Sequence, residues 1–273
     1  MSEKVQVKLG KIQETLLLPL WGRAVESRKE KPRLVDTKAV EIIDRIDYDF
    51  SAIAKNISWV TQLAWVARSL HIDRAILNFM KRYPGGTIVN IGCGLDTTFE
   101  RIDNGQIRFF DLDLPDVVDL RKVFFTNSER RKTIASSFLD KDWLARLESE
   151  NGLLFVAAGV FYYFDESQIK DFIIRVADSF PGSELFFDSA SPLGVKVANE
   201  KVIRDGGMDE TAILKWGIKN SKAIEVWDRR IKLVDEFHMF KGFKRGYSLK
   251  TRYGLMMSDI LNIMSMVHLR IES

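Results

Sequence analysis

The succession of short apolar segments after Pro84 constrains the fold more than any other feature of this chain. Five short segments, most of them rich in Val, Ile, Leu and Phe, are expected to be strands, at 87–91, 107–112, 133–137, 153–157 and 184–188. Helical patterns separate them, at about 95–103, 115–128, 140–149 and 166–180. Strands that alternate with helices at this spacing form βαβ units, whose parallel sheet is covered on both faces. The sequence therefore predicts an α/β domain that begins near Pro84.

The residues on either side of this unit are expected to be mostly helical. Those before it predict a helix over 5–20 that Pro19 ends or bends, a charged loop over 26–33, a short helix capped by Asp36 that reaches about Asp44, and a helix over 57–83. Those after it predict helices at 193–204, 209–218 and 220–227, then strands near 231–237 and 265–271 with a helix around 255–263 between them. We therefore divide the chain into a helical lid, 1–84, and a main domain, 85–273, with a helical insertion at about 190–230.

Composition excludes several classes of function. Lys and Arg number 41 against 38 Asp and Glu, and a formal net charge of +3 is too small to drive binding to nucleic acid unless the cations cluster. A single cysteine, Cys93, permits no intramolecular disulfide and no thiolate zinc site, and three scattered histidines make a metal centre unexpected. The N-terminus has no signal-peptide pattern, and the longest nearly continuous apolar run, 153–164, is too short to span a bilayer. We expect a soluble, cytoplasmic protein without a membrane or nucleic-acid partner.

A glycine turn follows the first predicted strand of the α/β unit. The residues are Val89-Asn-Ile-Gly92-Cys-Gly94-Leu-Asp-Thr-Thr98. Glycine lets the backbone approach a ligand, and the start of the next helix offers unpaired N–H groups. Alone, the pattern is equally typical of a tight turn that binds nothing.

An acidic residue near the end of the second strand makes the pattern more specific. Asp113 lies 21 positions after Gly92, where a carboxylate can accept hydrogen bonds from both hydroxyls of an adenosine ribose. The same carboxyl could instead cap a helix that begins near Pro115. A dinucleotide fingerprint requires a third glycine, and Thr97 occupies that position. S-adenosylmethionine, which has no phosphate, is therefore a better fit than NAD or FAD.

Several further segments resemble the leucine carboxyl methyltransferase family, and most closely its bacterial polyketide O-methyltransferases. They are Pro19-Leu-Trp-Gly-Arg-Ala24, Trp65-Val-Ala-Arg68, the glycine turn, Asp111-Leu-Asp-Leu-Pro-Asp-Val-Val118 with Arg121, and Phe155-Val-Ala-Ala-Gly-Val-Phe-Tyr-Tyr-Phe164. The resemblance implies a Rossmann-like class I methyltransferase sheet, mostly parallel with an antiparallel last strand. It also implies a helical N-terminal lid and a helical insertion before the last strands.

The resemblance also implies which residues bind S-adenosylmethionine and release S-adenosylhomocysteine. Arg68 matches the arginine that binds the methionine carboxylate, a task that suits a guanidinium. Asp113 matches the ribose-binding acid. The remaining expected cofactor positions are Gly92, Cys93, Gly94, Leu112, Ser137, Phe138 and Ala158. Ala158 stands where the family often has a glutamate, so it carries no polar role. Cys93 is interpreted as a small loop residue and not as a nucleophile.

The acceptor is expected to be a small hydrophobic molecule. Tyr162, Tyr163 and His71 are candidates to position it, although aromatic packing under the lid explains each of them equally well. A carboxylate acceptor needs no general base, whereas a phenol would benefit from one. The sequence therefore predicts O-methylation of a polyketide-like carboxylate or phenol. Three alternatives stay open: a sensor or partner-binding protein that has lost turnover, carboxyl methylation of a protein C-terminus, and, less favoured, an NAD-dependent oxidoreductase. The oligomeric state stays open as well.

Overall fold

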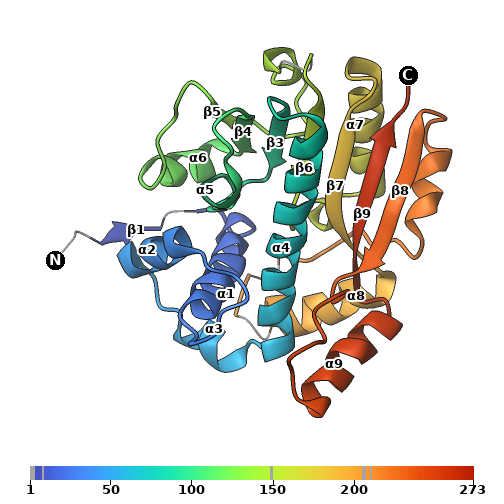
Figure 1. Cartoon of the computed structure of the whole chain (residues 1–273). Helices are drawn as coiled ribbons and strands as arrows, with labels where there is room; N and C mark the ends of the chain where they lie inside the picture. The colour runs from blue at the N-terminus through green and yellow to red at the C-terminus, as the bar shows by residue number, and fades with distance from the viewer. Residues whose placement is uncertain (1–3, 8, 148–149, 205–206, 210) are drawn as a thin grey trace.

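A seven-stranded sheet forms the centre of the molecule in the computed structural model, which describes residues 4–7, 9–147, 150–204, 207–209 and 211–273 (Figure 1). The strands are β3 (Thr87–Ile91), β4 (Arg108–Asp113), β5 (Arg131–Ala135), β6 (Leu153–Ala157), β7 (Glu184–Ala190), β8 (Ile231–His238) and β9 (Met264–Ile271). Their order across the sheet is β5-β4-β3-β6-β7-β9-β8, and β9 pairs antiparallel with both of its neighbours. The predicted α/β class and the antiparallel last strand are confirmed.

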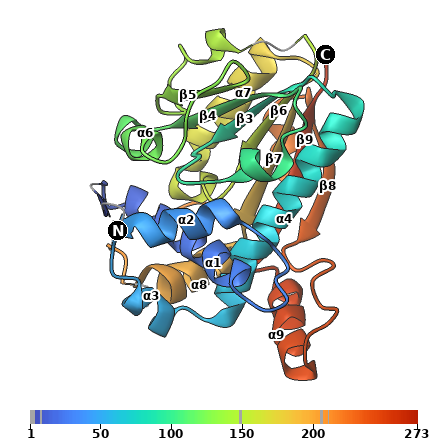
Figure 2. The ribbon, with the colours of Figure 1, turned by 60° about the vertical axis from the view of Figure 1, so that its left-hand side comes forward.

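Helices cover both faces of this sheet because the strands alternate with them along the chain. On one face lie α4 (Trp59–Arg82), α5 (Thr98–Ile102) and α9 (Leu249–Ile260), whose apolar side chains share a core with β3, β6 and β7. On the other lie α7 (Glu166–Ser179) and the 3₁₀ turns η2 (Leu144–Arg146), η3 (Phe161–Tyr163) and η5 (Ser221–Val226). Both views show α4 crossing the front of the sheet (Figures 1 and 2). No helix in the described residues is both long enough and apolar enough to span a bilayer.

The N-terminal helices gather below the carboxyl ends of the parallel strands (Figure 2). They are η1 (Gln13–Leu16), α1 (Leu17–Ser27), α2 (Thr37–Arg45) and α3 (Ser51–Asn56), with a small parallel pair formed by β1 (Val5–Gln6) and β2 (Ile46–Asp47). α6 (Pro115–Lys122) contributes Leu120 to the core that these helices share. Since α4 packs on the sheet itself, the division of the chain at residue 84 stays a prediction, and from here on the lid means η1, α1, α2 and α3.

Several predicted helices were wrong in position or type. The stretch 5–20 is not one helix, and Pro19 lies in the first turn of α1, where its missing N–H costs no hydrogen bond. The charged loop begins only after Ser27, and Glu26 is buried and accepts a hydrogen bond from the Arg33 backbone N–H. The predicted helix at 140–149 is reduced to η2, and residues 148–149 lie outside the described part of the chain.

The insertion is less helical than predicted. It consists of α8 (Pro192–Ala198), a π-helical turn η4 (Asn199–Arg204), an irregular stretch at 211–218, and the 3₁₀ turn η5. The predicted regular helix at 209–218 was therefore wrong for the described residues, and residue 210 lies outside them. The prediction at Asp36 was right: it caps α2 by accepting a hydrogen bond from the Ala39 N–H at 2.9 Å.

Asp36 also joins the lid to the sheet. Its Oδ2 accepts from Arg23 Nε at 2.9 Å, from Arg101 Nη1 at 3.1 Å and from Thr97 Oγ1, although only 2% of the residue is exposed. Arg101 in turn pairs with Asp73 of α4 through two hydrogen bonds of 2.8 Å. Removing one charge of such a buried set leaves its partners uncompensated.

We predict that Asp36→Asn lowers the free energy of unfolding by about 3 kcal/mol, because asparagine keeps the cap but removes the charge that two buried arginines share. Asp165→Asn is the matched control: Asp165 caps α7 at an exposed position and has no arginine partner among the described residues. Urea denaturation of both variants measures the effect. Equal changes in the two would contradict the role of Asp36 as a buried counter-ion.

Candidate active site

A cavity of about 830 Å³ opens at the carboxyl ends of β3, β4, β6 and β7, between the sheet and the N-terminal helices. This volume is near the upper end of the range of about 300–1,000 Å³ for small-molecule sites. The chain leaves β3 and β6 toward opposite edges of the sheet, and ligands of open α/β sheets bind at such a switch point. The cavity is therefore the candidate site.

The glycine turn forms one end of the cavity. Gly92 and Gly94 have φ values of 60° and 48°, a backbone conformation that residues with a Cβ rarely adopt. A Cβ on Gly92 would also lie 2.5 Å from Val160 Cγ2. Arg121 holds the turn from behind, since its Nη1 donates to the carbonyl oxygens of Gly94 at 2.8 Å and Asp96 at 2.9 Å. The turn thus presents bare backbone to the cavity.

A fully buried carboxylate fixes Arg121. Asp111 Oδ2 accepts from Arg121 Nη2 and from Arg131 Nε, both at 2.8 Å, and Asp111 is 0% exposed. A guanidinium that pairs with a carboxylate on one side and donates to loop carbonyls on the other has little freedom. The sequence placed Arg121 in a motif but gave it no role; the structure shows that it shapes the glycine turn.

Asp113 lies beside this turn on the cavity wall. Its Oδ2 accepts from the Gly94 N–H at 2.7 Å and its Oδ1 from the Leu114 N–H at 2.8 Å. The residue before α6 is Leu114, and Asp113 accepts no hydrogen bond from the helix interior in the described structure, so capping does not explain its position. Burial raises the pKa of Asp113 to about 6, despite the opposing effect of the two N–H donors. Two ribose hydroxyls would favour the charged form further.

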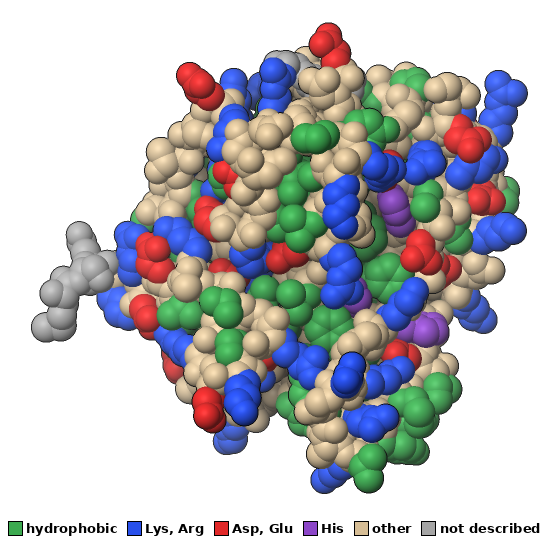
Figure 3. All heavy atoms as spheres, in the orientation of Figure 1, with side chains coloured by type: hydrophobic (Ala, Val, Ile, Leu, Met, Phe, Trp, Pro, Cys, Tyr) green, Lys and Arg blue, Asp and Glu red, His purple; other side chains and the backbone are tan. Residues whose placement is uncertain are grey.

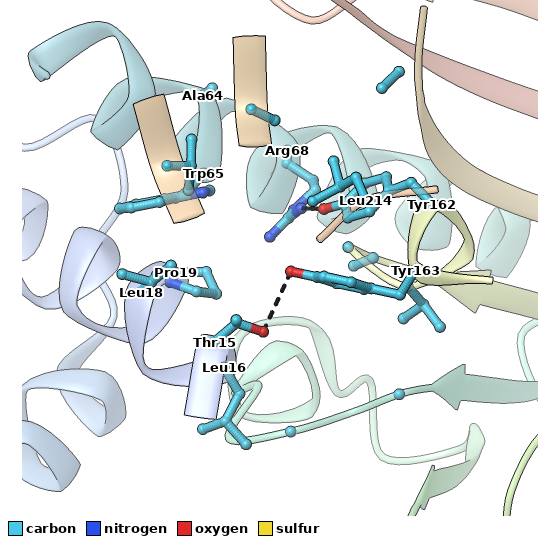
Figure 4. Close-up of a pocket in the computed structure, with 18 of the residues that line it drawn as sticks. Thr15, Leu16, Leu18, Pro19, Ala64, Trp65, Arg68, Tyr162, Tyr163 and Leu214 are labelled. Atoms are coloured by element: carbon cyan, nitrogen blue, oxygen red, sulfur yellow. Dashed lines mark hydrogen bonds between the residues drawn. The ribbon is translucent and has the colours of Figure 1, made fainter. Parts of the chain in front are cut away.

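Arg68 of α4 points into the middle of the cavity (Figure 4). Its Nη1 donates to Asp188 Oδ2 and to the Tyr162 hydroxyl, both at 3.0 Å. No described residue accepts a hydrogen bond from its Nε or Nη2. The guanidinium therefore keeps donors that suit a ligand carboxylate.

Asp188 is the important residue that the sequence analysis missed. It is 1% exposed, and besides Arg68 it binds the Gly159 N–H through Oδ1 at 2.6 Å. A Cβ on Gly159 would approach Arg68 Nη1 to 2.7 Å, so the glycine leaves room for the guanidinium. The sequence does indicate that Asp188 lies near the site, because it ends the predicted strand 184–188 at the same edge of the sheet as Asp113.

Tyr162 and Tyr163 of η3 both line the cavity. The Tyr163 hydroxyl donates to Thr15 Oγ1 of the lid at 3.3 Å, and Figure 4 shows this contact closing the gap between the sheet side and the lid. Burial raises the pKa of both phenols. Both are therefore neutral hydrogen-bonding groups at pH 7 and not bases.

His71 lies apart from the other predicted residues. Its Nε2 contacts the Met239 carbonyl oxygen at 2.9 Å, its ring packs edge-on against Phe237 and Phe243, and it does not line the cavity. The aromatic-packing alternative describes it. The other predicted residues share the cavity wall: Arg68, Gly92, Cys93, Gly94, Leu112, Asp113, Ser137, Phe138, Ala158, Tyr162 and Tyr163. Burial raises the pKa of the Cys93 thiol, which makes it a poor nucleophile.

The far end of the cavity is apolar. The side chains of this apolar lobe come from the N-terminal helices, α4, the insertion and the turn before β9, and include Leu18, Trp65, Val202, Ile203, Leu214, Ile263 and Met264. Figure 4 shows Leu18 and Pro19 on one side of the space and Tyr163 and Leu214 on the other, with the Arg68 side chain pointing into it. One cavity thus joins a polar end at the glycine turn to an apolar lobe under the lid. In the described residues, no cluster of His, Cys, Asp or Glu could hold a metal ion.

The strand order, the glycine turn after the central strand β3 and the acid that ends β4 are those of the class I methyltransferase fold. Solved structures share the fold: a methyltransferase from Thermobifida fusca, itself described as putative, superposes with a TM-score of 0.60 at 12% identity over 98% of this chain and 96% of its own. A DUF574 family protein from Streptomyces avermitilis gives 0.59 at 14% identity over 92% and 96%.

The chain belongs to the leucine carboxyl methyltransferase family, whose model matches residues 17–177. It is 30% identical over 221 residues to the tetracenomycin polyketide synthesis O-methyltransferase TcmP of Streptomyces glaucescens, a match that covers 80% of each chain. It is also 24% identical over 286 residues to the S-adenosyl-L-methionine-dependent methyltransferase dpfgK of Gibberella zeae, over 96% of this chain and 94% of that one. The protein is therefore an S-adenosylmethionine-dependent methyltransferase.

The residues present fit this cofactor. The bare backbone at Gly92 and Gly94 lets a ligand approach the turn, Asp113 offers carboxylate acceptors to ribose hydroxyls, and Arg68 offers donors to a carboxylate. We expect Asp113 to hold the nucleoside end of the cofactor and Arg68 to hold its amino-acid end.

We predict that cofactor affinity falls as the pH drops below 6. The Asp113 carboxyl is then protonated and accepts hydrogen bonds from the ribose hydroxyls poorly. Each further pH unit therefore weakens binding by up to about tenfold, while binding above pH 7 does not depend on the protonation of this group. Titration calorimetry from pH 5 to 8 measures the profile. Asp113→Asn should flatten it at lower affinity, and Asp119→Asn, on the exposed side of α6, should leave it intact. An unchanged slope in Asp113→Asn would contradict the assignment.

We predict that Asp188→Asn weakens cofactor binding by on the order of 10- to 100-fold, because the amide no longer neutralises and fixes Arg68. Asp178→Asn is the control, since it alters an exposed aspartate that pairs with Arg230. Calorimetry with S-adenosylhomocysteine compares the two variants. Arg68→Ala in the Asp188→Asn background should add little, because the two side chains act as one unit; full additivity would show that they act separately.

Proposed function

We propose that the protein transfers the methyl group of S-adenosylmethionine to an oxygen of a small, flat, hydrophobic acceptor of polyketide type. The observation that carries the proposal is that one cavity contains both the cofactor end, with Arg68 and the glycine turn, and the apolar lobe. We assign this lobe to the acceptor and call it the acceptor lobe. The name of the relative TcmP, a polyketide synthesis O-methyltransferase, supports the acceptor class.

The wall of the cavity favours a carboxylate as the acceptor oxygen. Among its described residues there is no histidine, and the two tyrosines are held neutral, so no general base faces the acceptor lobe. Lys201 and Lys215 lie in the wall, whereas its carboxylates, Asp96 and Asp113, belong to the glycine-turn end. A carboxylate is already ionised at pH 7 and needs no base, while an ordinary phenol does.

The protein positions the acceptor and excludes water from the cavity. Thr15, Leu18 and Tyr163 close the cavity from two sides, and the acceptor lobe orients a flat molecule with its oxygen toward the methyl group. When bound, the cofactor supplies a methyl on a positively charged sulfur; the acceptor oxygen forms the new bond to carbon, and the carbon–sulfur electron pair stays on sulfur, giving S-adenosylhomocysteine.

A dinucleotide does not suit the glycine turn. Thr97 stands at the third glycine position, is 0% exposed, and hydrogen-bonds to Asp36 and Arg101. The backbone there is covered by the lid, so a pyrophosphate has no open helix terminus to bind.

The proposal is tested by transfer of labelled methyl from S-adenosylmethionine to three panels: polycyclic aromatic acids, polycyclic phenols, and peptides that end in leucine. We expect turnover with the aromatic acids, and heat of binding from S-adenosylmethionine but not from NAD. Turnover confined to peptides would replace the acceptor assignment, and binding without turnover in any panel would favour a sensor. Heat from NAD would revive the oxidoreductase alternative.

We predict that Leu214→Ala lowers kcat/KM for the acceptor about tenfold or more while cofactor affinity stays unchanged, because the side chain belongs to the apolar cluster that forms the acceptor lobe. Leu193→Ala, an exposed leucine of α8 outside the cavity, is the matched control. Steady-state kinetics at saturating cofactor measures kcat/KM for the acceptor, and titration calorimetry measures cofactor affinity. A loss of cofactor affinity in Leu214→Ala would contradict the separation of the cavity into two ends.

A further inference from the structure

α9 carries an apolar stripe that faces solvent. Leu249, Tyr253, Met256 and Ile260 recur at i, i+4, i+7 and i+11, so they lie along one line of the helix. They are 80%, 61%, 40% and 65% exposed, whereas Leu255 on the opposite side is fully buried. Contiguous apolar surface of this kind marks a binding face in a soluble protein.

Cations flank the apolar stripe on both sides. Lys250 and Arg252 follow Leu249 by one and three positions, which places them on opposite sides of the stripe, and both are exposed. The segment 239–262 holds five basic residues, Lys241, Lys244, Arg245, Lys250 and Arg252, against one acid, Asp259, a balance of +4 that exceeds the +3 of the whole chain. Asp259 is buried and pairs with Lys244 at 2.8 Å. Figure 3 shows hydrophobic and basic side chains together at the lower right, over α9.

The C-terminal end of α9 reaches the cavity. Leu261, at the end of α9, is 48% exposed and also lines the cavity, as does Ser258. At the middle of the helix, Gly254 packs against Trp59, which is itself 47% exposed. α9 projects from the body beside the lid in both ribbon views (Figures 1 and 2).

We propose that α9 binds the surface of an anionic lipid bilayer, with the apolar stripe in the headgroup region and the flanking cations on the lipid phosphates. A helix with an exposed apolar line bordered by Lys and Arg is typical of interfacial helices. The proposal departs from the expectation of no membrane partner, which considered only segments long enough to span a bilayer, because an interfacial helix does not need to span it. A second copy of the chain is a poor occupant, because two faces of this charge would repel each other. The binding itself is independent of the proposed reaction, although it would place the acceptor lobe next to the phase in which hydrophobic molecules dissolve.

The test is co-flotation of the purified full-length protein with vesicles of phosphatidylcholine alone and with one quarter phosphatidylglycerol. We expect binding to the anionic vesicles only, and weaker binding at high salt. Lys250→Glu/Arg252→Glu should bind at least about 25-fold more weakly, since each cation near such a surface is worth about fivefold. Leu249→Asp/Ile260→Asp should lose at least about tenfold.

Matched controls carry the same changes elsewhere. Arg146→Glu/Lys170→Glu reverses two exposed cations on η2 and α7, and Val226→Asp charges an apolar residue that is 87% exposed on η5. Both should bind like the wild type. Loss of binding in the first control, or none in the α9 variants, would overturn the proposal, as would absence of binding to anionic vesicles. A concentration-dependent dimer in light scattering that Leu249→Asp/Ile260→Asp abolishes would assign the stripe to a second copy instead, and binding to a soluble polyglutamate as strong as to vesicles would assign it to an acidic protein. None of these results depends on methyl transfer.

Discussion

The buried carboxylate of Asp36 joins elements that the chain makes far apart. It caps α2, pairs with Arg23 of α1, and receives Arg101 and Thr97 from the segment that follows the glycine turn. A cofactor turn of glycines has little rigidity of its own, because glycine has the largest conformational freedom in the unfolded chain. The charges around it supply the rigidity, so that lid and turn are placed by the same ions.

A second buried carboxylate acts from the sheet side. Asp111 fixes Arg121, which donates to the carbonyl oxygens of the turn, while the Asp113 carboxylate accepts a hydrogen bond from the Gly94 N–H of the turn. Most cations around the turn meet a carboxylate, so they stabilise it without leaving a strong local charge. Arg68 and Asp113 keep hydrogen-bonding capacity toward the cavity, one at each end of the space expected for the cofactor.

Sequence reasoning succeeded where a local pattern decides the outcome. The strand positions followed from short β-branched and aromatic runs, and the cofactor residues followed from a turn and an acid at fixed spacing. It failed where tertiary contacts decide. Glu26 looked like part of a solvated loop, but α1 extends through it and buries it. Asp188 is 120 positions from Arg68, and nothing local indicates that the two touch. His71 shares a helix with Arg68 but faces another direction.

The small net charge of the chain hides an uneven distribution. Many charged side chains form ion pairs around the glycine turn. Others lie at the opposite end of the sheet, where Glu184 contacts Arg82 and His268. Such pairs cancel in the total and have little field at the surface. The segment 239–262 has a balance of +4 with one buried acid, so the remainder of the chain is slightly negative. What a surface can attract depends on this clustering and not on the sum, because charges more than about 10 Å apart are screened from one another at ordinary ionic strength. A total of +3 therefore argues against a broad polyanion-binding face but is silent about a single helix.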